Sequence, residues 1–574
     1  MHKLKNLLKY LDGYRKYLFL GPFFKLLEAV FELIVPLVTA DIIDVGIAQR
    51  DTGYIIKKGI LVIFLGLAGL AFALTCQFFA AKCAFGYGTA LRKSLYSHIN
   101  SLSRTETDRL GASTLTNRLI NDTNALQTGI NMGIRLGTRV PFLIIGAVVM
   151  AMTRDVKLSL IFLAAAPLIA FIIWKIMSIT IPMYSSSQKK LDRISMLTGE
   201  NLEGVRVIRA FSRQKDENTE FHEASEELCE NVIAVGKISA FLNPVTFMIM
   251  NLSAALIIWC GGFRVNSGNL TQGDVTAFVN YMTQISLALV VLANLIVFFN
   301  KAAAGAGRIS DIFKITSSMA DGTESIDEND FPAVEFDSVC FRYDGAQENS
   351  AEGISFKLYK GETLGIIGGT GSGKSTVAAL IPRFYDAAGG EIKIYGKNIK
   401  EYRLSEVRKF VVSVPQKAAL ISGTIADNIR VGKKDATDEE ITEALKTAQA
   451  WDFVSRLPDG INAPVLQYGR NFSGGQKQRL TIARAIVSKP AVLILDDSTS
   501  ALDMQTDYLL RKAVSDNLKD TIVIMISQRA SSLKNADKIL VMEDGECSGF
   551  GKNDELTENC SVYREIVEIQ KAGE

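Results

Sequence analysis

One stretch decides the fold of the second half of this chain: Gly368-Gly369-Thr370-Gly371-Ser372-Gly373-Lys374-Ser375. It matches the pattern GxxxxGK[ST], follows an apolar run at 363–367 and opens a helical pattern near Lys374. In such a loop, glycines let successive backbone N–H groups point at phosphate oxygens, the lysine reaches the β- and γ-phosphates, and the serine hydroxyl can ligate Mg²⁺. The sequence therefore predicts an ATP or GTP site, to which we also assign the next residue, Thr376.

A second part of the predicted site lies downstream, where the apolar run AVLIL at 491–495 ends in Asp496. A carboxylate at the end of a parallel strand beside a phosphate-binding loop is where such folds hold Mg²⁺. After a polar, acidic stretch at 317–329, β-branched runs alternate with helical patterns. That alternation is typical of an α/β domain.

The first half of the chain is far more apolar than the second. Stretches long enough or nearly long enough to cross a bilayer lie at 17–40, 59–81, 140–153, 158–174, 238–263 and 275–300. We therefore predict six membrane spans. The two long connectors, 82–135 and 175–237, carry most of the basic residues, which places them and both termini in the cytoplasm.

Two features of the first forty residues have alternative interpretations. Leu4, Leu7, Leu8 and Leu11 share one helical face, which favours an interfacial helix over a solvated tail. Lys25, Glu28 and Glu32 share a face of the first span. A salt-bridged cluster is a slightly better interpretation of them than a substrate contact.

Composition excludes several other classes of protein. The net charge of the 574 residues is only +2, so nothing indicates a nucleic-acid partner. The seven cysteines have neither metal-ligand nor disulfide spacing, and buried reduced thiols are the default interpretation. No cleavable signal peptide is visible.

The sequence Ser473-Gly474-Gly475-Gln476, directly before a helical pattern, leads to a family. With the phosphate loop and the Asp496 strand it resembles the ATP-binding-cassette (ABC) transporters, of which it is the signature motif. Tyr343 stands where the family stacks an aromatic ring on adenine, and Gln416 matches the glutamine that senses Mg²⁺ and the γ-phosphate. The resemblance implies ATP and Mg²⁺ as cofactors, with Ser375, Gln416 and Asp496 as metal ligands.

The order of the domains resembles the exporter subtype. We expect a membrane protein with a six-helix ABC exporter domain at 1–315, a linker at 316–332 and an α/β P-loop (RecA-like) nucleotide-binding domain at 333–574. In this family each ATP lies between one domain's phosphate loop and the other's signature motif. A single cassette is therefore half a transporter, which implies a second half-transporter, a lipid bilayer and a transported small molecule, lipid or peptide as partners.

Two residues depart from the family pattern. Asp497 stands where the catalytic glutamate is usual, and Gln528 stands where a histidine contacts the γ-phosphate. Aspartate is one methylene shorter, and misplacement by about 1 Å can cost on the order of 100-fold in rate. The pair resembles the degenerate chain of heterodimeric bacterial multidrug-type exporters, which binds ATP but hydrolyses it slowly. The alternatives are a slow homodimeric exporter and an ATP-regulated assembly that does not pump.

Overall fold

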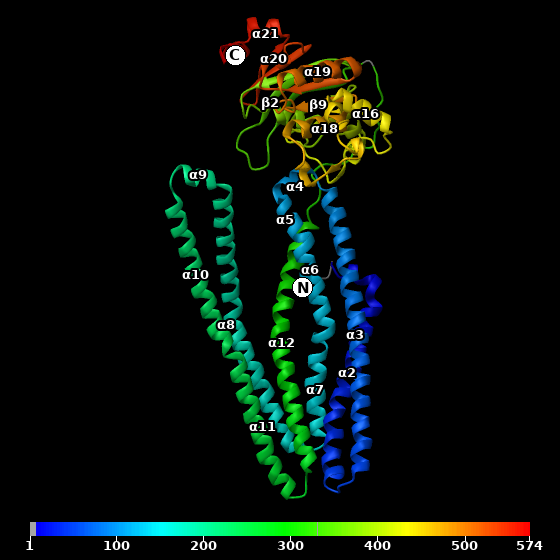
Figure 1. The fold of residues 1–574 in the computed structure, drawn as a ribbon, viewed down its shortest axis with the longest axis vertical. Coiled ribbons are helices and arrows are strands. Elements are labelled where there is room, and N and C mark those ends of the chain that lie inside the picture. The colour runs from blue at the N-terminus through cyan, green and yellow to red at the C-terminus, as the bar shows by residue number, and fades with distance from the viewer. Residues whose placement is uncertain (1–6, 330, 574) are drawn as a thin grey trace. The chain divides into compact units, whose positions relative to one another are not determined.

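The computed structural model describes residues 7–329 and 331–573. They fall into two compact units, Met1–Asn100 with Ala112–Ile315, and Ser101–Gly111 with Thr316–Glu574. The first contains the long helices and the second contains the sheets (Figure 1). The segment Ser101–Gly111 therefore belongs with the second unit, although the sequence places it between membrane helices. The predicted ends of the exporter domain, at 315, and of the linker, at 332, stay a prediction.

Long helices build the first unit. Its α-helices are α2 (Arg15–Asp41), α3 (Thr52–Ser101), α5 (Ala112–Asn117), α6 (Thr123–Met132), α7 (Arg139–Met152), α8 (Val156–Glu203), α9 (Val205–Ala210), α10 (Gln214–Ala240), α11 (Leu242–Asn266) and α12 (Gln272–Ile312). π-Helical turns at Ile42–Ile47, Arg118–Asp122 and Gly133–Gly137 extend some of them. Helices α8 and α10 run side by side and are joined at their tip by α9 (Figure 1).

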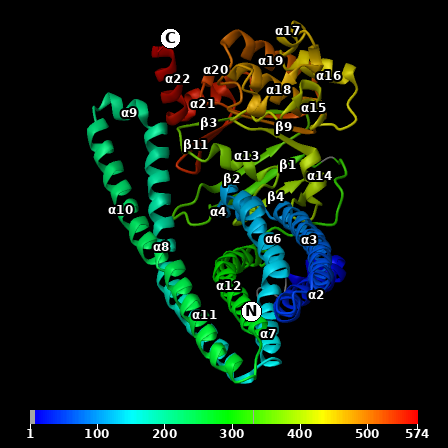
Figure 2. The same ribbon diagram turned by 60° about the horizontal axis from the view of Figure 1, so that its bottom comes forward.

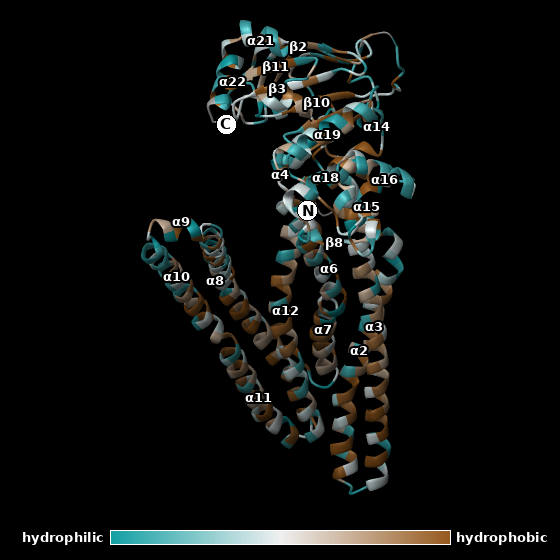
Figure 3. Cartoon of the chain, turned by 45° about the horizontal axis from the view of Figure 1, so that its top comes forward, coloured by the Kyte–Doolittle hydropathy of each residue, from teal (hydrophilic) through white to brown (hydrophobic). Residues whose placement is uncertain are grey.

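Five helical segments in the described part of the chain are long and apolar enough to cross a membrane: Thr52–Ser101, Ala112–Met152, Val156–Glu203, Gln214–Asn266 and Gln272–Ile312. They correspond to five of the six predicted spans. The remaining stretch, 17–40, lies in helix α2, but three ionisable side chains interrupt its apolar character. Its crossing therefore stays a prediction. Hydrophobic residues dominate the lower parts of α2 and α3, whereas the end of α10 next to α9 is largely hydrophilic (Figure 3).

Lys25, Glu28 and Glu32 of α2 each have a charged partner. Lys25 Nζ donates to both carboxylate oxygens of Glu28, at 2.8 and 2.7 Å, and Arg139 of α7 donates to Glu32 at 2.9 Å. The predicted salt bridge is therefore present between Lys25 and Glu28, whereas Glu32 pairs with Arg139 instead of joining it. Helix α12 packs against α2, α6, α7, α8 and α11. The buried Tyr281 of α12 donates its hydroxyl to Leu33 O at 2.8 Å.

The N-terminal segment differs in part from the prediction. Residues 1–6, including Leu4, lie outside the described residues. Leu8–Tyr14 forms a 3-10 helix in which Leu8 is exposed while Leu11 is buried, and Leu7 before it is buried as well. Two of the predicted lipid-facing leucines therefore pack against the protein itself.

Two main sheets build the second unit. The larger has the order β12-β11-β3-β10-β9-β6, and the smaller, antiparallel one has the order β2-β1-β4-β5. The strands are β1 (Val334–Phe341), β2 (Ala351–Leu358), β3 (Thr363–Gly368), β4 (Gly389–Ile394), β5 (Lys397–Asn398), β6 (Val411–Val414), β7 (Gly423–Thr424), β8 (Pro464–Val465), β9 (Val492–Asp496), β10 (Ile522–Ile526), β11 (Lys538–Glu543) and β12 (Glu546–Gly551). Strands β3, β10, β9 and β6 run parallel, so their carboxyl ends meet at one edge.

Helices cover this sheet. They are α13 (Lys374–Leu380), α14 (Leu404–Phe410), α15 (Ile425–Arg430), α16 (Asp438–Thr447), α17 (Trp451–Val454), α18 (Gly474–Ile486), α19 (Met504–Asn517), α20 (Ala530–Leu533), α21 (Asn553–Asn559) and α22 (Ser561–Gly573). Helices α15 to α19 gather on one side of the unit, and β1, β2 and β4 lie on the other (Figure 2). The near-continuous apolar runs of β3, β9 and β10 are buried on both faces, as expected for parallel strands between helices.

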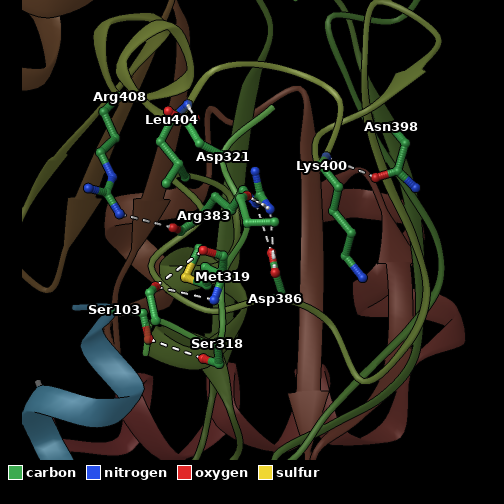
Figure 4. Close-up of polar contacts among 12 residues, drawn as sticks. Ser103, Ser318, Met319, Asp321, Arg383, Asp386, Asn398, Lys400, Leu404 and Arg408 are labelled. Carbon is green, nitrogen blue, oxygen red and sulfur yellow. Dashed lines mark hydrogen bonds and ion pairs between the residues drawn. The ribbon is translucent and has the colours of Figure 1, made fainter. Parts of the chain in front are cut away.

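Helix α4 (Arg104–Leu110) is packed onto the second unit. Buried Glu106 closes a capping box with Ser103 and also accepts a hydrogen bond from Ser318 N at 3.2 Å. The Ser103 and Ser318 hydroxyls are 3.2 Å apart (Figure 4). The start of α4 and the start of the predicted linker are therefore tied together.

The predicted linker is anchored further along its length. Buried Arg383 donates to Ala320 O at 2.9 Å and pairs with Asp386 at 2.8 Å, while Leu404 N donates to Asp321 at 2.7 Å (Figure 4). Hydrogen bonds thus hold residues 318–321 in place within the second unit.

Candidate functional site

The phosphate-loop residues join the carboxyl end of β3 to α13, the strand-loop-helix context that the motif requires. Gly373, directly before α13, has φ +93°, and a Cβ there would lie 2.1 Å from Ser350 O. Only glycine fits this left-handed, closely packed position. The backbone of the loop is therefore shaped as the sequence predicts.

Lys374 lies folded back over the loop. Its buried Nζ donates to Gly368 O at 3.0 Å and also to Gly369 O. Burial lowers the pKa of Lys374, while Asp497 and Asp496 act in the opposite direction. The ammonium group is thus hydrogen-bonded to backbone carbonyls, and phosphate oxygens can replace those carbonyls as its acceptors.

Ser375 and Asp496 are brought together. Ser375 Oγ donates to Asp496 Oδ1 at 3.0 Å, although the two residues are 121 positions apart. Burial raises the pKa of the Asp496 carboxyl, and nearby Asp497 raises it further against the effect of the Ser375 hydrogen bond. A hydroxyl and a carboxylate at this edge offer the oxygen ligands that a hard divalent cation prefers.

Asp497 and Gln416 are also in contact. Gln416 Nε2 donates to Asp497 Oδ2 at 3.1 Å. Asp497 has φ +44°, a left-handed conformation that aspartate tolerates better than most residues. Its amide N–H donates to Ile526 O at 3.1 Å, which holds it beside the end of β10. The short carboxylate is therefore tied to the glutamine of the neighbouring strand end.

Gln528 follows β10 by two residues and is exposed. Ser527 N donates to Ile366 O of β3 at 3.2 Å, so the backbone before Gln528 is fixed to the strand that leads into the phosphate loop. Within the described residues, the side chain of Gln528 has no hydrogen-bond partner. It stands at the same sheet edge as Lys374 and Asp496.

Tyr343 lies at the far end of the site. Its hydroxyl is 3.2 Å from Thr376 Oγ1, and its ring packs edge-on against Phe341 and Tyr385. It lines a cavity of about 600 Å³. The cavity is also lined by Thr105, Asp108 and Arg109 of α4.

The structure reveals two residues of this region that sequence reasoning missed. Tyr385 donates its hydroxyl to Asp108 at 2.6 Å, and Arg104 lies over its ring. Burial raises the pKa of Tyr385 to about 12, and the hydrogen bond to Asp108 adds to the effect. No local pattern marks the pair, because it depends on α4 packing against a segment 277 residues away.

The signature residues form the start of α18. Ser473 is the N-cap: its Oγ accepts from Gln476 N at 3.3 Å, and its own N–H donates to Gln476 Oε1 at 2.9 Å. A Cβ on Gly475 would lie 3.1 Å from Ala501 O, so the loop 500–503 passes close by. Among the described residues, no hydrogen bond or ion pair joins Ser473, Gly474, Gly475 or Gln476 to the chain's own phosphate loop.

The seven cysteines are free thiols, but the expectation that they are buried is wrong for Cys229 and Cys547. Cys76, Cys83 and Cys560 are buried, Cys260 and Cys340 are half-buried, and Cys229 and Cys547 are exposed. In the part of the chain that the structure describes, no group of three or more histidine, cysteine, aspartate or glutamate side chains could hold a metal ion.

Comparison with known proteins agrees with this geometry. The family model described as ABC transporter transmembrane region matches residues 18–289, and the model described as ABC transporter matches residues 351–500. The ABC transporter ATP-binding protein YfiB of Bacillus subtilis is 36% identical over 547 residues, which cover 95% of each chain. The ATP-dependent lipid A-core flippase of Chromobacterium violaceum is 28% identical, over 99% of this chain and 97% of the flippase.

A solved structure shows the same fold. It is a bacterial Atm1-family ABC exporter with ATP bound, which superposes with a TM-score of 0.80 at 23% identity and covers 98% of this chain and 99% of its own. The relatives match along nearly the whole length of the chain, membrane half included. The chain therefore belongs to the ABC transporter family and has the exporter arrangement, a membrane-spanning region followed by an ATP-binding cassette.

Proposed function

We propose that this chain is one half of a heterodimeric bacterial exporter whose own ATP site binds nucleotide but hydrolyses it slowly. One observation carries the proposal: Asp497 and Gln528 stand at adjacent strand ends beside an otherwise complete set of ATP-holding residues. The proposed chain crosses the cell membrane six times, with both termini and the cassette in the cytoplasm. Its partner is a second half-transporter with glutamate and histidine at the corresponding positions.

The residues at the sheet edge fit MgATP. Tyr343 would stack on adenine, the loop Gly368–Thr376 would hold the phosphates, and Ser375, Asp496 and Gln416 would provide the oxygen ligands of Mg²⁺. The hydrogen bond between Ser375 Oγ and Asp496 Oδ1 supports this assignment, because it sets a hydroxyl beside a carboxylate, both oxygen ligands that a hard divalent cation prefers. When bound there, Mg²⁺ would supply positive charge against the negative charge that develops on the phosphates during hydrolysis.

The weak point of this site is the group that should activate water. Asp497 is shorter than the usual glutamate, and Gln416 already donates to one of its oxygens. Gln528 can donate a hydrogen bond to the γ-phosphate, but it cannot carry positive charge. ATP would therefore be held here and cleaved slowly.

The signature residues would serve the partner's site instead. Ser473 and Gly474 are exposed, and among the described residues they form no polar contact with this chain's own loop. A helix N-terminus attracts anionic phosphate. The proposed transporter therefore has one slow site, on this chain's loop, and one fast site, on the partner's loop.

The proposed substrate is small or amphipathic. The flippase of Chromobacterium violaceum, by its name, moves lipid A-core, and its likeness along 99% of this chain favours a lipid or another amphipathic molecule. Sustained accumulation of substrate in vesicles separates a pump from an ATP-regulated assembly that does not pump. Native mass analysis separates a heterodimer from a homodimer.

Restoring the missing groups tests the proposal directly. In a Ser473→Ala background, which disables the partner's site, hydrolysis comes only from this chain's own loop. Adding Asp497→Glu and Gln528→His should raise the single-turnover rate at that site by roughly 100-fold, because the water-activating carboxylate is extended and a charged phosphate contact is supplied. The rate is measured with radiolabelled ATP on the full-length assembled transporter.

The chain offers matched controls for both changes. Exposed Asp516 lies near the end of α19, outside the predicted site, so Asp516→Glu makes the same substitution away from the phosphate loop. Half-buried Gln449, which lies outside the predicted site, provides the second control as Gln449→His. If the controls accelerate hydrolysis as much as the site variants do, or if the site variants do not accelerate it, the degenerate-site proposal is wrong.

A further inference from the structure

The C-terminal helix α22 contacts the loop that carries Gln528. Gln570 Oε1 accepts a hydrogen bond from Ala530 N at 2.8 Å, and Gln570 Nε2 donates to Gln528 O at 2.6 Å. A single side-chain amide thus bonds to the backbone on both sides of Arg529. The Ala530 N–H and the Gln528 carbonyl have no hydrogen-bond partner within a strand or a helix, and the Gln570 amide provides one for each.

Apolar packing fixes α22 in this position. Tyr563 is fully buried in a cluster with Ile367, Ala530 and Leu533, and half-buried Val562, Ile566 and Val567 of α22 pack against the same cluster. Helix α22 also contacts α20, which begins two residues after Gln528. The helix is therefore held by its apolar face, and Gln570 projects from it onto the loop.

The loop is held from its other side by the sheet. Ser527 N donates to Ile366 O, and Asp497 N donates to Ile526 O. Ser527 Oγ accepts from Arg529 N at 3.0 Å, which tightens the turn. The backbone of Gln528 thus lies between the edge of the sheet that bears the phosphate loop and the amide of Gln570.

We propose that Gln570 is a positioning residue, through which the C-terminal helix fixes Gln528 for contact with the γ-phosphate and so sets how firmly this chain's site retains ATP. The inference rests on the proposed function, because it takes Gln528 to be the phosphate contact. Removing the amide frees the loop on one side, and the backbone that carries the exposed Gln528 side chain is held less firmly.

The test measures the loop and the nucleotide separately. In the full-length chain in lipid nanodiscs, Gln570→Ala should speed hydrogen exchange in peptides spanning 527–534 by roughly 30-fold, the factor that corresponds to losing two ordinary hydrogen bonds. Photolabelling of this chain by 8-azido-ATP with Mg²⁺ should then require a several-fold higher nucleotide concentration. Glu568→Ala, at an exposed position of the same helix, is the control and should change neither measurement.

Two further variants test the route through Gln528. Gln570→Glu keeps the acceptor for Ala530 N but loses the donor to Gln528 O, so it should give an intermediate effect in both measurements. In a Gln528→Ala background, Gln570→Ala should no longer weaken photolabelling, because the contact it positions is gone. Unchanged exchange, unchanged photolabelling, or an effect that persists in the Gln528→Ala background each overturns the proposal.

These outcomes are independent of the slow-site proposal. Hydrogen exchange and photolabelling need no turnover, so fast hydrolysis on this chain's own loop would refute the slow-site proposal and leave the role of Gln570 standing. Conversely, an unchanged loop in Gln570→Ala refutes the positioning role and leaves the slow site standing.

Discussion

Ser473→Ala is expected to lower the ATPase rate of the assembled transporter by roughly 100-fold, the size of effect typical for loss of one donor to developing charge. Lys374→Ala, in contrast, should lower it only partly. Ser473 completes the partner's fast site, whereas Lys374 holds ATP on the slow site of this chain. The measurement is steady-state phosphate release from the transporter reconstituted in liposomes.

Ser473 also caps α18, so its loss must be separated from simple destabilisation of the helix. Thr437 is the N-cap of α16, with a capping box to Glu440, and it lies outside the predicted site. Thr437→Ala removes an equivalent cap, worth about 1 kcal/mol of stability, and should leave the ATPase rate close to that of the unmodified chain. Equal losses from Ser473→Ala and Lys374→Ala would contradict the asymmetry between the two sites.

Gly373→Ala is expected to weaken ATP binding to this chain's own site by roughly 100-fold. The added Cβ would lie 2.1 Å from Ser350 O, and alanine is strained at φ +93° by about 1–2 kcal/mol. The overlap adds to this strain, so the loop must shift, and the N–H groups that point at phosphate shift with it. Photolabelling of this chain by 8-azido-ATP measures the loss.

A second glycine separates the two contributions. Gly460 has φ +52°, and nothing lies within 4 Å of a Cβ built there. Gly460→Ala therefore introduces backbone strain without overlap, and thermal unfolding should show a modest loss of stability with unchanged photolabelling. Full ATP binding by Gly373→Ala would show that the loop does not need this close approach.

The local parts of the site could be predicted from the sequence. The phosphate loop can be recognised from the sequence because its chemistry requires glycines, a lysine and a serine at fixed spacing. The apolar run before it predicts β3, and the helical pattern after it predicts α13. Asp496 could be predicted because a buried strand ends at it. Five of the spans follow from apolar stretches alone, whereas the charged face of α2 leaves the sixth without the same support.

The parts that could not be predicted depend on contacts between distant segments. Nothing near Gln570 indicates that its amide bonds to the loop at Gln528, 42 residues earlier, because the pairing arises only when the apolar face of α22 packs. The pairing of Tyr385 with Asp108 is similar. Tertiary packing decides which of these side chains come into contact, and that packing cannot be predicted from a single sequence.

The position of α4 has a practical consequence for dividing this protein. The predicted domain boundaries suggest truncating the chain near residue 316 to obtain a separate ATP-binding fragment. Such a fragment would lack residues 101–111, so Ser318 N would lose its partner Glu106 and Tyr385 would lose Asp108. The cassette incorporates a helix from the other half of the chain, so the two halves are not modules that a single cut can separate.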